Sequence, residues 1–190
     1  MNKTSALKNV CAALASDSAA EAAKIVDRHY PFSPIPATKR KYGAVDLARL
    51  FVRDGFINRY SGERLVFSPA LRMISVELED SFPYHRNWKS DATHSAYWDL
   101  GATLDHVVPV ARGGADEESN WVTTSMARNS AKMNFTIDQL GWTLHPGGDF
   151  DEWDGLMRWS VEYGRGKPEL LGISTLKTWH RAAKRVLNGG

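Results

Sequence analysis

An Asp-His pair, an Asn and a Lys between residues 105 and 132 carry groups that could hydrolyse a phosphodiester bond. Such hydrolysis needs an activated water, a cation that neutralises charge on the phosphate and the leaving oxygen, and side chains that hold both in line. Asp105 offers a carboxylate oxygen and Asn129 a carbonyl oxygen, and Mg²⁺ and Mn²⁺ prefer such oxygen ligands. We therefore predict that Asp105 and Asn129 bind one Mg²⁺ or Mn²⁺ ion.

His106, next to the predicted metal ligand, is the candidate general base, because an imidazole that titrates near pH ~6.5 can be neutral and take a proton from water. Asn120 completes the predicted catalytic set in a supporting role, since its amide could tie a loop to the preceding strand. Lys132 is the third member. It could contact phosphate or, as an open alternative, interact with the C-terminal dipole of a helix.

Four consecutive elements must position these side chains: a strand at 103–109, a loop at 111–119, a second strand at 120–124 and a helix at 125–133. Gly113 and Gly114 suit the loop because glycine allows positive φ and close backbone approach. Successive strand side chains point to opposite faces. Asp105, Asn129 and His106 must nevertheless converge on one metal site. We therefore expect Asp105 and His106 to sit at a strand end, a twist or a bulge, where side chains can be re-aimed.

These residues belong to a longer pattern that consists of Leu104-Asp105-His106-Val107-Val108-Pro109, Arg112-Gly113-Gly114, Asn120-Trp121-Val122, Asn129 and Lys132. The pattern resembles the HNH endonuclease family. The resemblance implies a ββα-metal core made of strand, loop, strand and helix, and it covers roughly residues 50–135. It is weaker upstream, where Arg53-Asp54-Gly55-Phe56, Tyr60 and Gly62 are similar to a segment of zinc-containing members.

The zinc-containing members carry four cysteines where this chain has Asn58, Ser61, Ser125 and Arg128. Without these thiolates a structural Cys₄ zinc site cannot form, so we predict no structural zinc. Hydrogen bonds or packing must then join the two segments. An alternative for Arg53-Asp54-Gly55 is a helix that simply ends at a Gly C-cap.

Length and composition predict one domain with additions. The chain has 190 residues, 43% of them hydrophobic, and seven Trp, which is enough for a full core. We expect an N-terminal helical segment and linker at 1–43, the core at 44–140 with an insertion near 75–100, and a C-terminal helical extension at 141–190. The single Cys favours a reducing cytoplasm, and no run approaches the ~18 apolar residues that span a membrane.

The outer elements follow from capping signals and breakers. We predict two helices within 5–30, the second opened by a Ser18-x-x-Glu21 capping box, a helix near 44–54, a strand at 141–144, a helix from an Asp149 N-cap to about 163 that Gly164 stops, and a helix at 175–187 that Ser174 caps.

Several basic residues could contact the DNA backbone, although a solvated charge run is an open alternative. They are Lys39, Arg40, Lys41, Arg112, Lys177, Arg181 and Lys184. The formal net charge is only +2, so local patches matter more than the total. Aromatic and cationic residues also gather at 80–100, where they could stack bases or pack on the core.

The sequence therefore predicts an α+β, metal-dependent DNA endonuclease of HNH type. A restriction or phage-defence nuclease is the first expectation, and a mobile-element or phage-encoded nuclease is the second. The alternative from another class is a DNA-binding protein that keeps the HNH scaffold without cleavage. DNA is the expected partner, a homodimer stays open, and no membrane partner is expected.

Overall fold

The computed structural model describes residues 1–34 and 41–189, and its internal contacts divide the chain into two units, Met1–Pro36 and Ala37–Gly190. The sequence predicted one domain with additions, whereas the contacts separate the N-terminal residues from the rest. The predicted DNA contacts of Lys39 and Arg40 lie outside the described residues.

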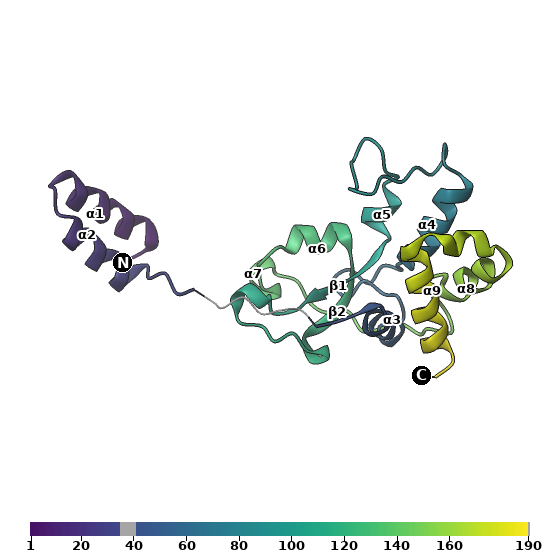
Figure 1. Cartoon of the computed structure of the whole chain (residues 1–190). Coiled ribbons are helices and arrows are strands. Elements are labelled where there is room, and N and C mark those ends of the chain that lie inside the picture. The colour runs from purple at the N-terminus through teal and green to yellow at the C-terminus, as the bar shows by residue number, and fades with distance from the viewer. Residues whose placement is uncertain (35–40, 190) are drawn as a thin grey trace. The chain divides into compact units, whose positions relative to one another are not determined.

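The N-terminal unit consists of the two predicted helices, α1 (Lys3–Ala15) and α2 (Ala19–His29), and they pack against each other (Figure 1). Asn2 caps α1 because its side-chain oxygen accepts a hydrogen bond from the Ser5 backbone N–H at 2.8 Å. The capping box predicted at Ser18 is wrong: Ser18 precedes α2, but its side chain makes no capping hydrogen bond.

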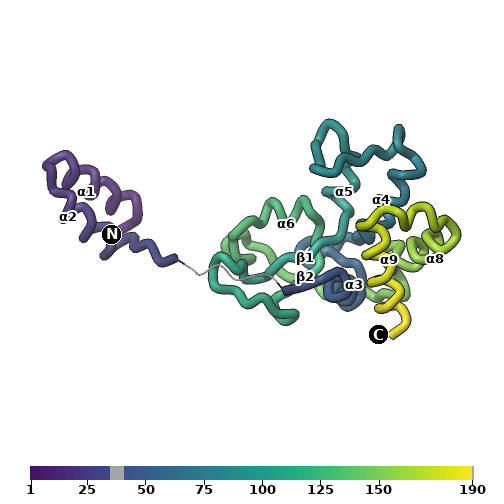
Figure 2. The backbone as a smooth tube through the Cα atoms, viewed as in Figure 1, coloured from purple at the N-terminus to yellow at the C-terminus, as the bar shows by residue number. Residues whose placement is uncertain are grey.

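The second unit is of mixed α+β class, and Figure 2 follows its backbone in chain order. Its elements are α3 (Ala44–Arg53), α4 (Ser68–Glu77), α5 (Ala96–Asp99), β1 (Ala102–His106), β2 (Trp121–Ser125), α6 (Met126–Lys132), α7 (Ile137–Leu140), α8 (Met157–Gly166) and α9 (Ser174–Leu187). Short 3-10 turns lie at Val110–Arg112, Glu118–Asn120 and Pro168–Gly172.

Strands β1 and β2 form an antiparallel pair with Asp105 opposite Val122 and His106 opposite Trp121. Helices α3 and α6 both contact the pair and lie on different sides of it (Figure 1). Leu104 and Trp121 belong to the apolar cluster on the α3 side, together with Phe51. The alternation of a strand then places Asp105 on the α6 side.

The main core lies between α3, the strand pair and the C-terminal helices. Phe51 and Phe67 pack against Trp179 of α9, with ring centroids 6.4 and 5.5 Å apart. Gly55, which has φ +59°, ends the turn after α3 and lies directly against the Gly148 backbone. A side chain there would collide with that backbone, so this glycine holds the 147–148 segment close to α3.

Three expectations for residues 141–164 are wrong. Residues 141–144 form no strand, since the described strands pair only with each other. Asp154 rather than Asp149 accepts hydrogen bonds at the start of α8, from the backbone N–H groups of Leu156 and Arg158. Gly164 lies inside α8 and does not stop it.

The predicted last helix is present as α9, but the Ser174 side chain does not cap it. Amphipathic spacing explains why α9 forms, because Leu176, Ala182 and Ala183 are buried on one side. None of the helices in the described ranges is long and apolar enough to cross a membrane.

Candidate active site

A strand-loop-strand-helix unit carries most of the predicted site residues. Strand β1, strand β2 and helix α6 lie within a few residues of the predicted boundaries. Ser125 joins β2 directly to α6, because its hydroxyl oxygen accepts the Arg128 backbone N–H at 3.2 Å and so caps the helix. The second strand therefore passes into the helix without a loop.

The loop between the strands is closed by the residues that the sequence singled out. Asn120 donates from Nδ2 to the carbonyl oxygens of Val108 and Ala115, and its Oδ1 accepts the Val108 N–H at 2.9 Å. Gly113 has φ +86°, and Gly114 lies so close to the Val108 carbonyl that no Cβ would fit. The supporting role of Asn120 and the need for both glycines are thus confirmed.

Asp105 lies on the α6 side of β1, where two donors converge on one of its oxygens. The Tyr60 hydroxyl donates to Oδ2 at 2.7 Å, and Lys132 Nζ lies 2.9 Å from the same atom. Lys132 is fully buried and also donates to the His106 carbonyl oxygen at 2.7 Å. Burial, together with the Asp105 charge, raises the pKa of Tyr60, so Tyr60 stays a neutral donor.

Lys132 therefore takes neither of its predicted positions. Its ammonium is enclosed and paired with Asp105, so it is not presented to a phosphate at the surface. Its main interaction is also not with the end of α6, because its two close partners both belong to β1. In the described conformation it neutralises the predicted metal ligand.

Asn129 reaches β1 at the residue before Asp105. Its Nδ2 donates to the Leu104 carbonyl oxygen at 3.1 Å, which leaves the amide oxygen of Asn129 as an acceptor. Among the described residues no three His, Cys, Asp or Glu side chains gather as metal ligands.

His106 points to the other face of β1. Its Nε2 lies 2.8 Å from Asp116 Oδ1, and the Trp121 indole Nε1 lies 3.1 Å from the same oxygen and 3.2 Å from His106 Nε2. An indole N–H can only donate, and a carboxylate can only accept. Both N–H groups are best satisfied if they share Asp116, which puts the proton of a neutral His106 on Nε2.

This tautomer leaves the lone pair of His106 on Nδ1. Nδ1 has no hydrogen-bond partner among the described residues. His106 Nδ1 is also accessible to solvent. Among the described residues, the fully enclosed side-chain nitrogens and oxygens without a partner are Asn58 Nδ2 and His180 Nδ1, and His106 Nδ1 is not one of them. A base oriented by a carboxylate on its other nitrogen is the arrangement that proton abstraction uses.

Asp116 itself is held by three donors. Burial alone would raise its pKa, but the hydrogen bonds from His106, from the Lys41 backbone N–H and from Trp121 outweigh burial and lower the pKa. Its side chain is only 6% exposed. Asp116 is therefore a charged acceptor that fixes the imidazole from the loop side.

The expected convergence of Asp105, Asn129 and His106 on one space is not present. Asp105 and Asn129 are together on the α6 side, whereas the His106 ring is held on the opposite face. His106 does end β1, but the strand register is regular up to His106 and contains no bulge. The two adjacent residues therefore point apart, as regular strand geometry dictates.

The two segments that carry cysteines in zinc-containing HNH members are joined by hydrogen bonds here. Asn58 is buried, and its Oδ1 accepts from the Thr124 hydroxyl at 3.0 Å. The Arg59 N–H donates to the Thr123 carbonyl oxygen, and Asp54 Oδ2 accepts the Thr123 N–H. Hydrogen bonds therefore join the upstream segment to β2, as predicted, but they reach Thr123 and Thr124 and not the expected Ser125 and Arg128. Ser61 instead donates to Glu63, and the lack of structural zinc stays a prediction.

The predicted DNA-contacting residues do not form one surface. Arg181 lines an α3–α9 groove of about 640 Å³ with Arg49 and Arg185, whereas Lys184 lines a separate α8–α9 groove. Lys177 is exposed on α9 and lines neither. Two further predicted residues are exposed near the loop: Arg112 donates to the Asn134 carbonyl oxygen, and Lys41 donates its backbone N–H to Asp116.

Asp116 and Arg49 are the residues that sequence reasoning missed. Asp116 lies in a run of three acids, Asp116, Glu117 and Glu118, and nothing in its spacing marks it as the partner of His106. Arg49 is one charge on an amphipathic helix, and only the packing of α3 on α9 brings it to Arg181. Both assignments depend on tertiary contacts.

Comparison with known proteins yielded no match to a family model, to a curated protein or to a solved structure.

Proposed function

We propose that this chain is a metal-dependent DNA endonuclease of HNH type. The observation that carries the proposal is the strand-loop-strand-helix unit, in which Asp105 of β1 contacts Lys132 of α6 and Asn129 of α6 hydrogen-bonds to Leu104, the residue before Asp105. These two residues would hold Mg²⁺ or Mn²⁺. A bound ion would supply the positive charge that phosphate and the leaving oxygen need.

In this proposal His106 abstracts the proton of the attacking water through Nδ1. Asp116 accepts the Nε2 proton and so keeps the lone pair on Nδ1. Asn120 closes the loop that carries Asp116, and it therefore acts on catalysis only through the loop. For His106 to reach a water near Asp105, the residues that end β1 must rearrange when DNA binds.

DNA is the proposed substrate, and the α3–α9 groove supplies a surface for its backbone. Arg49, Arg181 and Arg185 line this groove, and the one carboxylate there, Asp46, accepts the Gly43 backbone N–H at the start of α3. Guanidinium groups suit phosphate because they present planar, paired donors. A restriction or phage-defence role remains the first expectation, and genomic neighbourhood would test it.

A DNA-binding protein without cleavage is the second candidate. The observation that favours it is the Asp105–Lys132 ion pair, which already neutralises the predicted metal ligand, together with the opposite orientation of His106. A scaffold that has lost its chemistry could keep both contacts for stability alone. Activity is the property that separates the two candidates.

A plasmid-nicking assay with Mg²⁺, and with EDTA in a parallel arm, tests the nuclease proposal. We expect wild-type protein to nick supercoiled plasmid only with Mg²⁺, and His106→Ala to be slower by about 10²-fold to 10⁴-fold. His29→Ala, in the N-terminal unit, is the matched control and should cut normally. DNA binding with no Mg²⁺-dependent nicking by the wild type would favour the second candidate.

A further inference from the structure

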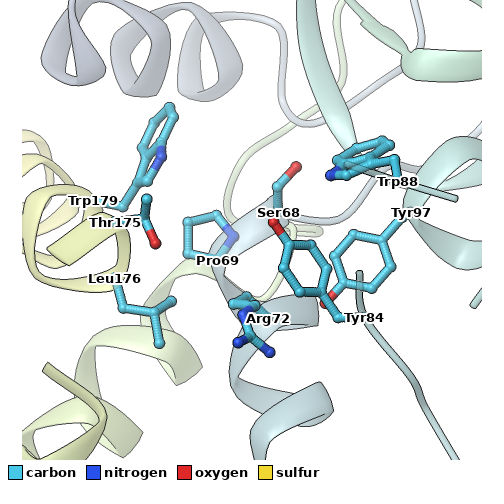
Figure 3. A pocket seen from close by; sticks show the side chains of 9 residues that line it. All are labelled: Ser68, Pro69, Arg72, Tyr84, Trp88, Tyr97, Thr175, Leu176 and Trp179. Carbon is cyan, nitrogen blue, oxygen red and sulfur yellow. The ribbon is translucent and has the colours of Figure 1, made fainter. Parts of the chain in front are cut away.

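A small cavity lies between α4, α9 and the 80–100 insertion, and four of its nine lining residues are aromatic (Figure 3). Its volume is about 170 Å³, and its ring-bearing walls are Tyr84, Trp88 and Tyr97 on one side and Trp179 on the other. Drug-sized ligands fill pockets of about 300–1,000 Å³. The cavity therefore suits a single flat ring system.

The aromatic wall is held in place before any ligand binds. The Tyr97 ring is buried, its hydroxyl lies 2.6 Å from Ser75 Oγ, and burial raises the pKa of Tyr97 to about 12. Tyr84 and Trp88 pack on Tyr97, with ring centroids 5.1 and 5.6 Å away. The aromatic residues of the insertion thus pack on the core and still leave ring surface facing the cavity.

The charge of the cavity selects among flat ligands. Arg72 is the one charged residue among the described residues that line it, and its guanidinium lies over the Tyr84 ring at 4.3 Å from the centroid. Arg72 forms no ion pair with a described carboxylate. Its positive charge disfavours a cationic ligand and favours a flat ring that carries a negative group.

A hydrogen bond links the cavity to the strand that carries the proposed catalytic residues. Ser68, which lines the cavity, donates from Oγ to the Ala102 carbonyl oxygen at 3.2 Å, and Ala102 is the first residue of β1. Asp105 follows three residues later, about 10 Å further along the strand. This distance of about 10 Å between Ala102 and Asp105 is about three times the ~3.4 Å rise per nucleotide of one DNA strand, so a strand of a few nucleotides could span it.

We propose that this cavity binds one nucleobase of the substrate strand, taken from single-stranded DNA or extruded from a duplex, and that Arg72 contacts a flanking phosphate. Stacking against aromatic rings tolerates every base, and extruded bases are held between aromatic side chains in other enzymes. The inference rests on the proposed function, because it takes the ligand to be the DNA that the β1 residues cut.

Binding of a short single-stranded oligonucleotide with 2-aminopurine at its centre, measured in EDTA, tests this inference without cleavage. We expect the wild type to quench the 2-aminopurine, and Trp88→Ala to weaken binding by about 5-fold to 100-fold, which is the usual effect of losing one stacked base. Trp88→Phe should restore most of the affinity. Trp159→Ala is the matched control, because Trp159 stacks on Tyr163 outside the cavity.

Arg72→Gln provides a second variant that leaves the rings in place. It should reduce the salt dependence of single-strand binding by about 0.7, the slope that one lost phosphate contact removes. Arg86→Gln, an exposed arginine of the same insertion, should leave the slope unchanged. Equal slopes for Arg72→Gln and wild type, or equal affinities for Trp88→Ala and wild type, would overturn the base pocket.

The experiments distinguish an error in the base-pocket inference from an error in the nuclease proposal. Normal plasmid nicking with no change in oligonucleotide binding by Trp88→Ala overturns the pocket alone. Loss of binding in Trp88→Ala, together with no nicking by the wild type, supports the pocket and counts against the nuclease.

Discussion

Two adjacent polar residues on opposite faces of β1 have partners of opposite charge. On the α6 side, Asp105 is neutralised by a buried ammonium, that of Lys132. On the loop side, His106 is oriented by a carboxylate, that of Asp116. The first contact places a positive charge against a predicted metal ligand, whereas the second fixes the orientation of the predicted base. The α6 face therefore holds a buried ion pair, and the loop face holds an oriented imidazole.

This difference bears on how the site could become active. A metal ion at Asp105 would compete with Lys132 for the same carboxylate, so ion binding and the ion pair oppose each other. No buried cation lies against His106 in this way, because Asp116 accepts the Nε2 proton and Nδ1 has no hydrogen-bond partner among the described residues. We expect variants on the two faces to separate stability from chemistry.

The largest effect on stability is expected on the α6 face. Lys132→Met leaves Asp105 buried with only Tyr60 as a donor, and breaking a buried ion pair in this way costs about 3–5 kcal/mol. The free energy of unfolding, followed by Trp fluorescence in urea, measures this loss. All seven Trp lie after residue 87, so the signal reports the second unit.

The control and the double variant sharpen this comparison. Arg158→Met breaks an exposed ion pair with Asp151 and should cost at most about 1 kcal/mol. The double variant Asp105→Asn/Lys132→Met removes both charges and should lose clearly less stability than the two single variants added together. Additive losses would mean that Asp105 and Lys132 are not energetically coupled.

A smaller effect, on activity, is expected on the loop face. Asp116→Asn keeps the shape of the side chain but can donate to His106, so it no longer fixes the Nε2 proton. We expect kcat for nicking to fall by about 10-fold to 100-fold with little change in KM, as for other groups that orient a catalytic ligand or base. Supercoiled-plasmid kinetics at saturating Mg²⁺ measure both quantities.

Glu117→Gln is the matched control for Asp116→Asn, because Glu117 is exposed in the same loop and its side chain makes no hydrogen bond with a described residue. It should retain wild-type kcat. Equal kcat values for Asp116→Asn and wild type would show that the contact serves only the fold, and that His106 needs no orientation from Asp116.

The same comparison explains which features the sequence could predict. Asn120, Gly113 and Gly114 act within one loop, so their residue types predict their roles directly. The strand pair and α6 lie within a few residues of their predicted bounds. The partners of Asp105 and His106 could not be predicted, because Tyr60 and Asp116 reach them only through tertiary folding.

Competing local signals explain the errors in the C-terminal extension. Four acids near residue 150 could each begin a helix, and only packing decides that Asp154 does so. Trp142 and Thr143 have strand-forming side chains, but a strand needs a partner edge and none of the described strands provides one. The Trp142 ring instead packs on Tyr60, at a centroid distance of 5.4 Å.

The smallest expected effect is the acid dependence of stability on the loop face. The folded protein lowers the pKa of Asp116, so the ionised carboxylate stabilises the fold at pH values above its unfolded pKa of about 3.9. That contribution is lost as the pH falls through the lower, folded pKa. Asp116→Asn has no such proton to bind. The difference in unfolding free energy between wild type and Asp116→Asn should therefore be constant at neutral pH and shrink below about pH 4, in urea titrations at several pH values. A difference that grows on acidification would mean that the hydrogen bonds from His106 and Trp121 do not hold the carboxylate in its charged form.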